Sequence, residues 1–586
     1  MKLDDIFVDR IGDWGRFQTL AVFFTSLSSL PMALHTVSLI FIGGSEQSYW
    51  CALPTNEFDN FSHEALKDVF IPSKLGADGV KVYSKCEIYN LDNNSRQDIS
   101  EAITAEAILK LNSTFYASGV SDNQTTATRR CNAWQYGEDG RYKTSLLTQY
   151  GLYCEREWLL PLSQTLFMAG WMAGNIVFGS LADRYGRMKV IPLGFLVNTA
   201  IGIAMPFIPN YFVYIFFRFL IGVTSGGPYT VLYVLALELC GKKYRICVSS
   251  CISAGFNISL CLMAGIGYAM APVNHITMQL IIGSIPFIIV FYHWIFHESP
   301  RWLVSMHRYE GAKVIVKKIA KFNKRPKSKY EDDMLFEEES AELSCDKSAS
   351  LEKLSEKKYT ALDLFRTPNI RRITIATYVQ WFSCAFVWYG MIFAGGSLGA
   401  NVYINLCISG IVGIVGNILC VPLLNFFGRR PTTVTFMTLM ALSLLASIPL
   451  VGNPEFETAL IAVVFVGKLC TVIAFDTIWL HSTEVFPTCI RAVGVSTGCL
   501  MARLGALISP LVAKLATIQT SLPLIVFATV AVLATFCCIQ LPETNKRRLP
   551  ETIEEGEEFA KFSLSCRKPC KKKMRLNKPD PTLHSV

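Results

Sequence analysis

Runs of about 20 apolar residues recur along this chain and are separated by polar segments. A helix of that length crosses a hydrocarbon core of roughly 30 Å. The order is one run, a long polar loop, five runs, a charged loop and six runs. This pattern predicts an all-α membrane protein with twelve transmembrane helices. The predicted helices cover residues 17–42, 158–182, 189–208, 211–237, 246–271, 276–296, 373–393, 401–423, 432–451, 458–481, 493–514 and 523–541.

The polar segments between these runs define the orientation of the chain. Lysine and arginine gather at alternate connections, as in "DRYGRMK" (183–189) and "GKKYR" (241–245), and "KKK" (571–573) lies in the tail. Such residues mark the cytoplasmic side, so both termini are expected in the cytoplasm. The first run has no small-residue cleavage site, and we interpret it as a retained helix. The expected segments are a cytoplasmic N-terminus (1–16), helix 1 (17–42), an extracellular loop (43–157), helices 2–6 (158–297), a cytoplasmic loop (298–372), helices 7–12 (373–541) and a basic cytoplasmic tail (542–586).

The long loop 43–157 has two features of an extracellular segment. It contains four Asn-x-Ser/Thr sequons, which can be glycosylated only if the loop is translocated. It also contains an even number of cysteines, suited to two disulfides in an oxidising compartment. Three pairings of these cysteines are open, as is the alternative of unpaired thiols. The sequon residues are Asn60, Asn93, Asn112 and Asn123, and the cysteines are Cys51, Cys86, Cys131 and Cys154.

Composition narrows the class of protein further. Hydrophobic residues make up 51% and charged residues 17% of the 586 residues, which is too apolar for a soluble multidomain protein. No Gly-x-x-x-x-Gly-Lys-Ser/Thr loop is present, so we expect no direct use of ATP. Neither a zinc-spaced His/Cys cluster nor a nucleophile elbow is present, so we expect no enzyme, metal or cofactor. The expected partners are the lipid bilayer and a small solute, with no nucleic acid.

Three short motifs occur in the same order in both halves of the chain. In both copies of the second motif, an acidic residue and an arginine are seven positions apart. Parallel duplication of this kind is typical of carriers whose substrate site lies between the halves, near the middle of the membrane. The pairs are "GSLADRYGR" (179–187) with "LLNFFGRRP" (423–431), "ELCGKKYR" (238–245) with "EVFPTCIR" (484–491), and "HESPRW" (297–302) with "LPETNKR" (541–547).

These motifs resemble those of a known transporter family. "GSLADRYGR" is similar to the signature turn of the major facilitator superfamily, although Met188 stands at its last basic position. Further motifs are similar to the organic ion branch of the solute carriers, which includes organic cation, organic anion and carnitine-type transporters. The resemblance covers nearly the whole chain and implies two six-helix halves, alternating access and a plasma-membrane location. The motifs are "GDWGRFQ" (12–18), "YCEREW" (153–158), "ESPRWL" (298–303) and "EVFPTCIRAVGV" (484–495).

Charged residues of the repeated motifs are candidates for a cytoplasmic gate. A network of such charges across the cytoplasmic mouth can latch the outward-facing state of a carrier and break when the halves rock. The alternative is that these charges only set topology and remain solvated. Asn425 stands where the second-half turn would need an acid, which makes that turn the weaker match. The candidates are Asp183, Arg184, Arg187, Glu238, Arg245, Glu298 and Arg301, with Glu484 and Arg491 offering the second half the same chemistry.

Three ionisable residues lie deep within the predicted helices. Arg218 begins "RFLIG" and resembles the arginine that superfamily carriers keep in that helix. Asp476 precedes Glu484 by eight residues, about 12 Å at 1.5 Å per residue, and Arg503 follows Arg491 by twelve, about 18 Å. An ionised group there costs at least about 2.5–3.5 kcal/mol and is a functional candidate by default. Either Asp476 and Arg503 form a structural ion pair, or at least one of them lines the cavity and selects the charge of the solute.

The family resemblance bears on the charge of that solute. Arg503 stands where cation carriers have an aspartate and where anion and carnitine-type carriers have an arginine. Anion carriers usually have a lysine in the eighth helix, where Asn417 stands here, and the acid of cation carriers is also missing, with Gly413 in that region. The negative charge of Asp476, in contrast, favours a cation. A site with one charge of each sign suits a zwitterion such as a betaine or a carnitine-like amine.

Aromatic residues supply the rest of a candidate binding surface. Aromatic faces stabilise quaternary ammonium groups and also pack against flat organic anions. The alternative for each is a lipid-facing or core position. Small residues in "GWMAG" (170–174) and "GVTSG" (222–226) are expected to allow close helix packing. The aromatic candidates are Trp381, Tyr389, Tyr229 and Phe475.

Together these observations predict a polyspecific secondary transporter of small organic ions, with a preference for cations or zwitterions. A co-transported or exchanged ion is a further candidate partner. One alternative is an organic anion transporter. Another, from a different class, is a non-transporting receptor or sensor on the same scaffold.

Overall fold

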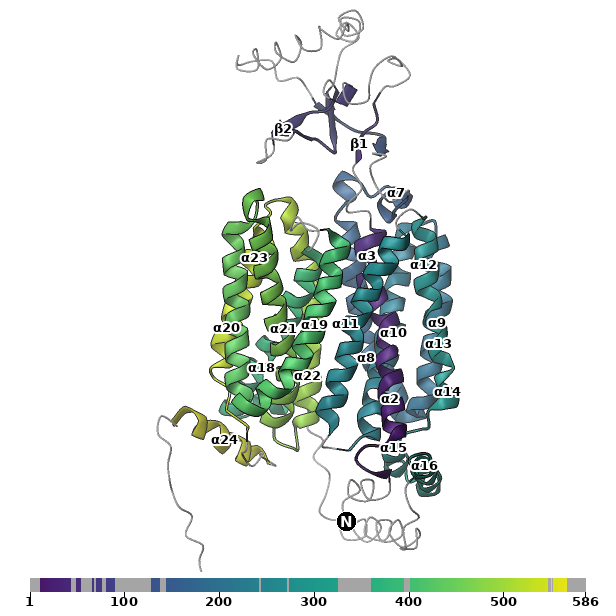
Figure 1. Cartoon of the computed structure of the whole chain (residues 1–586), viewed down its shortest axis with the longest axis vertical. Helices are drawn as coiled ribbons and strands as arrows, with labels where there is room; N and C mark the ends of the chain where they lie inside the picture. The colour runs from purple at the N-terminus through teal and green to yellow at the C-terminus, as the bar shows by residue number, and fades with distance from the viewer. Residues whose placement is uncertain are drawn as a thin grey trace, which may run out of the picture.

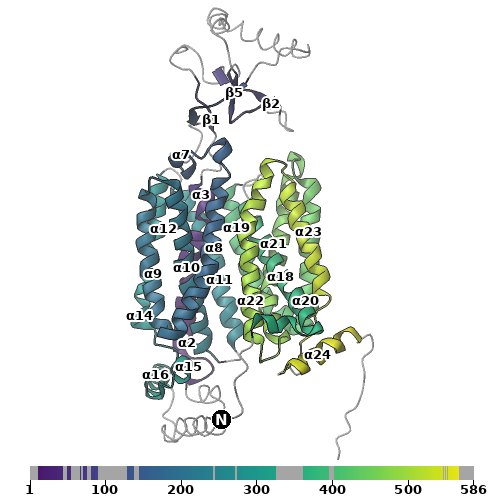
Figure 2. The same ribbon diagram turned by 180° about the vertical axis from the view of Figure 1, so that it is seen from behind.

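The computed structural model describes residues 11–43, 49–53, 66–67, 70–75, 81–89, 128–136, 144–241, 244–270, 273–324, 360–394, 401–545, 547, 550 and 552–565. Within these residues, twelve membrane-spanning segments form two groups of six, here called the N half and the C half. The two halves stand side by side in Figure 1 and Figure 2. The all-α fold predicted for the membrane part is confirmed.

The N half contains the first six segments. Its first segment divides at Ser28 into two helices, and its sixth is broken near Pro286, whose ring cannot continue a regular helix. The other four are single long helices. The elements are α2 (Arg16–Leu27), α3 (Ser29–Ile42), α8 (Leu159–Tyr185), α9 (Arg187–Ala204), α10 (Tyr211–Leu239), α11 (Arg245–Met270), α12 (His275–Ser284), α13 (Phe287–Val290) and α14 (Tyr292–Ile295). The short turn η3 (Met205–Phe207) follows α9.

The C half contains the other six segments. Across the described residues, nine segments of the two halves are long and apolar enough to cross a membrane by themselves, α12–α13 and α23 are shorter apolar helices, and α18 is the twelfth segment. The elements are α18 (Pro368–Phe393), α19 (Val402–Phe427), α20 (Arg429–Ser447), α21 (Glu457–Val485), α22 (Arg491–Ala513) and α23 (Leu522–Cys538). Short turns η7 (Ile448–Leu450), η8 (Pro454–Phe456) and η9 (Lys514–Thr517) connect them.

Glycines bring α8 and α10 into backbone contact. A methyl group at Gly170 would overlap the carbonyl of Phe219, and one at Gly222 would overlap the carbonyl of Phe167. Larger side chains at these positions would force the helices apart. The close packing predicted for the two small-residue stretches is therefore confirmed.

Short strands form a small structure at one end of the bundle, here called the strand side (Figure 1). Disulfides Cys51–Cys131 and Cys86–Cys154 select one of the three pairings left open by the sequence. The four sequon asparagines lie outside the described residues. Three antiparallel pairs are formed: β1 (Tyr49–Cys51) with β6 (Trp134–Tyr136), β2 (Ser73–Leu75) with β3 (Lys81–Tyr83), and β4 (Glu87–Tyr89) with β5 (Thr128–Arg130). They are followed by α7 (Leu146–Tyr150) and η2 (Cys154–Arg156).

The opposite end of the bundle, here called the tail side, carries shorter helices (Figure 1). These are α15 (Pro300–Ser305), α16 (Tyr309–Phe322), η5 (Ala361–Phe365) and α24 (Ile553–Ser565). Gly556 of α24 packs against Pro487, in the connection between α21 and α22. The tail side therefore carries the repeated charged motifs together with the segments that flank them.

Candidate functional site

A cluster of charges joins three connections of the N half on the tail side. Gly186 turns the chain sharply into α9. Its φ of +103° is a backbone conformation that glycine adopts readily. Glu298 then accepts hydrogen bonds from the backbone amides of Arg187 and Met188, both at 3.0 Å. The Arg187 guanidinium donates to Glu238 at 3.0 Å and lies 3.4 Å from Asp183. The carboxylate of Glu298 thus caps the N-terminus of α9 while Arg187 bridges α8, α9 and α10.

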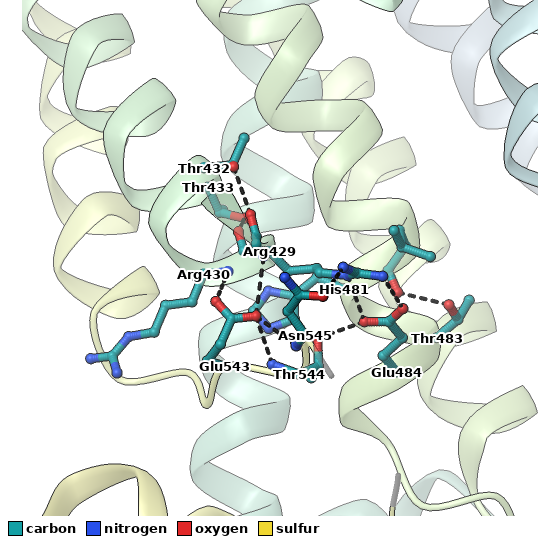
Figure 3. Close-up of polar contacts among 12 residues, drawn as sticks. Arg429, Arg430, Thr432, Thr433, His481, Thr483, Glu484, Glu543, Thr544 and Asn545 are labelled. Carbon is teal, nitrogen blue, oxygen red and sulfur yellow. Dashed lines mark hydrogen bonds and ion pairs between the residues drawn. The ribbon is translucent and has the colours of Figure 1, made fainter. Parts of the chain in front are cut away.

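The C half repeats this arrangement (Figure 3). Gly428, with φ +91°, precedes α20, and Glu543 accepts from the backbone amides of Arg429 at 3.1 Å and Arg430 at 2.9 Å. The Arg429 guanidinium binds both carboxylate oxygens of Glu484, each at 3.0 Å. A bidentate pair of this kind is stronger and more directional than a single contact. The two halves therefore share one arrangement of an arginine with two carboxylates.

The partner of Glu484 differs from the sequence-based expectation. Glu484 binds Arg429, whereas Arg491 donates to the backbone carbonyl of Phe486 and the hydroxyl of Thr488. Glu484 therefore belongs to the second-half cluster, but its arginine partner is Arg429 and not Arg491. Seven positions separate them along the chain, but Arg491 lies beyond the bend that ends α21, whereas Arg429 begins the neighbouring helix α20.

The remaining predicted gating residues lie around these clusters. Arg184 is exposed, with its guanidinium 5.4 Å from the Tyr185 ring. Arg245 and Arg301 are half-buried and both approach the Cys240 thiol, whose pKa burial raises to about 12.

The arginine–carboxylate pairs lie within the halves. Arg187–Glu238 and Arg429–Glu484 each join helices of one half. These pairs therefore brace each half. The network across the cytoplasmic mouth, which would latch the outward-facing state, stays a prediction.

Asp476 lies at the middle of α21 without a charged partner. Its side chain is half-buried, and within the described residues it makes no ion pair and no hydrogen bond. Tyr233 of the N half and Cys420 are near enough to interact with its charge. The ring of Trp479, one turn further along α21, lies 6.1 Å from the ring of Tyr233. Asp476 is therefore an uncompensated carboxylate beside aromatic rings from both halves.

Arg503 of α22 lies at the boundary between the halves. Its guanidinium carbon is 3.6 Å from the centre of the Trp171 ring, a cation–π contact from α8 of the N half. The hydroxyls of Tyr229 on α10 and Tyr389 on α18 are near enough to interact with its charge. Its Nε is buried without a hydrogen-bond partner in the described chain.

The structural ion pair, one of the two interpretations of Asp476 and Arg503, is not formed. No ion pair or hydrogen bond joins the two side chains in the described part of the chain. The structure therefore gives the two charges separate surroundings.

The other aromatic candidates differ in position. Trp381 is 1% exposed, and its Nε1 donates to Ser482 at 3.0 Å. Its ring contacts Phe475 at 5.7 Å and Trp479 at 4.7 Å between ring centres. Trp381 therefore packs in the core of the C half and supports the residues beside Asp476. Tyr229, Tyr389 and Phe475 lie around the two deep charges.

Two further cationic side chains, Arg218 and Lys468, are buried inside the halves. Arg218 is fully buried in the N half, where it donates to the carbonyl of His35 and to Ser38 and Gln164. Lys468 of α21 was missed by the sequence analysis. It is 5% exposed, and the signal that identifies it is one lysine in the apolar run "VFVGKLC" (464–470).

The halves contact one another on the strand side and in the middle of the bundle. Glu157, before α8, forms an ion pair with Lys514 of η9. The hydroxyl of Thr165 donates to the carbonyl of Leu507 at 3.1 Å. Nearer the middle, the rings of Phe256 and Trp388 lie 5.7 Å apart. The ion pair and the hydrogen bond thus lie on the strand side of Asp476 and Arg503, whereas ring contacts between the halves, including that of Tyr233 with Trp479, lie beside these two charges.

Comparison with known proteins assigns the family. The model of the "Sugar (and other) transporter" family matches residues 102–555. The chain belongs to this family of transporters. It is 30% identical over 554 residues to the organic cation transporter-like protein of Drosophila melanogaster, covering 94% of this chain and 92% of that protein.

Mammalian relatives support the same family, and a solved structure shows the same fold. Solute carrier family 22 member 3 of Mus musculus is 29% identical, covering 95% of this chain and 96% of the relative. Member 6 of the same family and organism is also 29% identical, covering 95% and 94%. The structure of the major facilitator superfamily proton:xylose symporter XylE bound to 6-bromo-6-deoxy-D-glucose matches with a TM-score of 0.56 at 14% identity, covering 93% of this chain and 99% of that one. The major facilitator fold and the resemblance to organic ion carriers are therefore confirmed.

Proposed function

We propose that this protein is a secondary transporter of small organic ions, with a preference for cations or zwitterions. The observation that carries the proposal is the uncompensated carboxylate of Asp476 beside aromatic rings of both halves. A carboxylate flanked by aromatic faces attracts an ammonium group through both its charge and the ring quadrupoles. Full-length relatives named organic cation transporters support the same class of substrate.

Arg503 extends the proposal to zwitterions. Its guanidinium keeps a buried Nε without a hydrogen-bond partner, and it lies among Trp171, Tyr229 and Tyr389. A carboxylate on the substrate would satisfy the free donor and compensate the charge. The solute would then place its amine near Asp476 and its acid near Arg503.

A neutral sugar suits these residues poorly, although the family model also covers sugar carriers. A sugar would leave both Asp476 and Arg503 uncompensated at membrane depth, where each ionised group costs at least about 2.5–3.5 kcal/mol. An organic ion removes part of that cost when it binds. The substrate is therefore inferred from the charges and not from the name of the family.

Transport would proceed by alternating access in the plasma membrane. We take the strand side as extracellular and the tail side, with both termini, as cytoplasmic, because arginine and lysine gather on the tail side. The Glu157–Lys514 ion pair and the Thr165–Leu507 hydrogen bond then lie toward the outside, as expected for contacts that close the outer side. The two tail-side clusters would keep each half rigid while the halves rock.

Uptake of three solutes by expressing cells tests this function. Tetraethylammonium carries only a positive charge, carnitine carries both charges and para-aminohippurate carries only a negative charge. We expect uptake of tetraethylammonium and carnitine above that of untransfected cells. Asp476→Asn should lower tetraethylammonium uptake at least about tenfold, because a bound cation would lose its counter-charge. Arg503→Ala should impair carnitine more than tetraethylammonium.

Surface expression is the control for each variant. Transport of para-aminohippurate alone would support the organic anion alternative. Absence of uptake of all three, with normal surface expression, would contradict the proposal and support a receptor or sensor.

A further inference from the structure

Lys468 is a buried lysine that has no acidic partner among the residues that the structure describes. It is 5% exposed and lies eight residues before Asp476 on α21. Its Nζ donates to Asn405 Oδ1 at 3.1 Å and to Ser409 Oγ at 2.7 Å, both on α19. The ring of Phe465 lies 5.0 Å away. All of these neighbours are neutral, so no negatively charged group in the described part of the chain contacts this lysine.

The helices packed around α21 contain no acidic residue that could pair with it. The sequences of α18, α19, α20 and α22 contain neither aspartate nor glutamate. Ser443 of α20 lies beside Gly467, next to the lysine. On α19 the titratable Tyr403 and Cys407 contact the N half instead, through Phe41 and Cys261. The deep charges of the C half are therefore Lys468, Asp476 and Arg503.

The sum of these three charges depends on the lysine. With all three ionised, the C half has one excess positive charge at membrane depth, which is costly. Release of one proton from Lys468 makes the sum zero. Lysine is suited to this because it changes protonation state readily when buried, whereas arginine does not.

The surroundings of Lys468 accept both protonation states. Ser409 donates its own hydroxyl hydrogen to the carbonyl of Asn405 at 2.6 Å, so its oxygen accepts from Nζ. A neutral amine keeps two N–H donors, enough for Asn405 and Ser409, and loses only the third proton. The two hydrogen bonds therefore hold the side chain in place whether or not that proton is present.

The charge of Asp476 couples protonation of Lys468 to binding of the substrate. Eight residues at 1.5 Å each put the two side chains about 12 Å apart along the helix axis. At an effective dielectric constant of about 20, the carboxylate raises the proton affinity of Lys468 about tenfold at that distance. An organic cation that neutralises Asp476 removes this attraction. Its binding would therefore promote loss of the proton from Lys468.

We propose that Lys468 binds and releases a proton during the transport cycle, so that the carrier exchanges an organic cation for a proton. This inference rests on the proposed transport function. Lys468 and Asp476 both lie on α21. The same rocking of the C half therefore changes the access of both groups from one side of the membrane to the other. The amine takes a proton from water on one side and returns it to water on the other, and no other reactant is needed.

The test uses purified full-length protein in liposomes that contain the pH indicator pyranine. Tetraethylammonium added outside the wild-type protein should raise the luminal pH, and an acidic lumen should accelerate uptake several-fold. Lys468→Met, which cannot bind the proton, and Lys468→Arg, which cannot release it, should both abolish the pyranine signal. Lys468→Met should still exchange labelled for unlabelled tetraethylammonium. Lys321→Met, at an exposed position of α16, is the control and should behave as wild type.

The wild-type measurement decides the proposal even if a variant does not fold. Uptake of tetraethylammonium by the wild type with no change in luminal pH would overturn it while leaving the proposed function intact. A pyranine signal of wild-type size in folded Lys468→Met would also overturn it. Absence of any uptake by the wild type would instead contradict the proposed function.

Discussion

At the scale of single residues, Trp171 sets the environment of Arg503. The ring lies 3.6 Å from the guanidinium carbon and comes from the opposite half, so the contact stabilises both the charge and its position. Cation–π contacts contribute about 0.5–2 kcal/mol. Trp171→Leu should therefore raise the KM for carnitine about threefold to thirtyfold, with a smaller effect on tetraethylammonium. Saturation uptake measures this, with Trp294→Leu, at a position 71% exposed in α14, as the control. Equal effects of both substitutions would contradict this role.

A second prediction at this scale separates the observed partner of Glu484 from the expected one. Arg429 makes a bidentate pair with Glu484, and the two side chains are 17% and 15% exposed. Arg429→Ala leaves a carboxylate without its counter-charge, which should destabilise the protein by about 3 kcal/mol. Arg491→Ala removes weaker contacts to a carbonyl and a threonine and should destabilise it by less than about 1 kcal/mol. Thermal unfolding in detergent should rank the two in this order, and the reverse order would restore the Glu484–Arg491 interpretation.

At the scale of elements, α24 is attached to the start of α18 by one carboxylate. Glu557 accepts hydrogen bonds from the backbone amides of Asn369 and Ile370, both at 2.9 Å. Burial acts to raise the pKa of Glu557, but hydrogen bonds from Thr367, Asn369 and Ile370 outweigh it and hold the pKa below its ordinary value of 4.5. A lowered pKa stabilises the folded form above the unfolded pKa, and this contribution disappears as the pH falls through the folded value. The attachment should therefore be complete at neutral pH and weaken only in acid, below about pH 4.5.

Hydrogen exchange at the start of α18 tests this attachment. Glu557→Ala should accelerate exchange of the Asn369 and Ile370 amides several-fold at pH 7, because both lose their acceptor. Glu558→Ala is a matched control, since the neighbouring carboxylate is exposed. Equal exchange in both variants would mean that the Glu557 carboxylate does not hold α24 against α18.

The sequence predicted the helices better than their contacts. Twelve apolar runs gave the membrane segments, because a run long enough to cross lipid has few other ways to satisfy its backbone. Helical rise gave the depth of Asp476 and Arg503 but not the direction in which each side chain points. Their separation therefore could not be predicted. Arg429 was overlooked because its partner belongs to a different repeated motif, and the two meet only when α20 and α21 pack together.

At the scale of the whole molecule, the two halves act as separate bodies with defined contacts. Bracing pairs lie within each half on the tail side, whereas an ion pair and a hydrogen bond join the halves on the strand side. Rocking of the halves can then break the strand-side contacts without disturbing the internal pairs. The relative populations of the states open and closed on the strand side should therefore depend on these strand-side contacts.

Glu157 and Lys514 form the ion pair among these contacts, and their charges can be exchanged to test it. Glu157→Lys places two like charges together and should open the strand side more often. Cys499, near Arg503, should then react several-fold faster with a membrane-impermeant thiol reagent applied outside. The assay requires a chain in which the other free cysteines are replaced by alanine.

The double variant Glu157→Lys with Lys514→Glu restores opposite charges in reversed order. Its labelling rate should return toward that of the parent chain, because the attraction depends on the product of the two charges and not on which side carries each. A loss of structure caused by Glu157→Lys alone would not be repaired by the second substitution. Equal labelling of the parent, single and double variants would show that this ion pair does not hold the outer side closed, leaving the packing of α8 against α22 to do so.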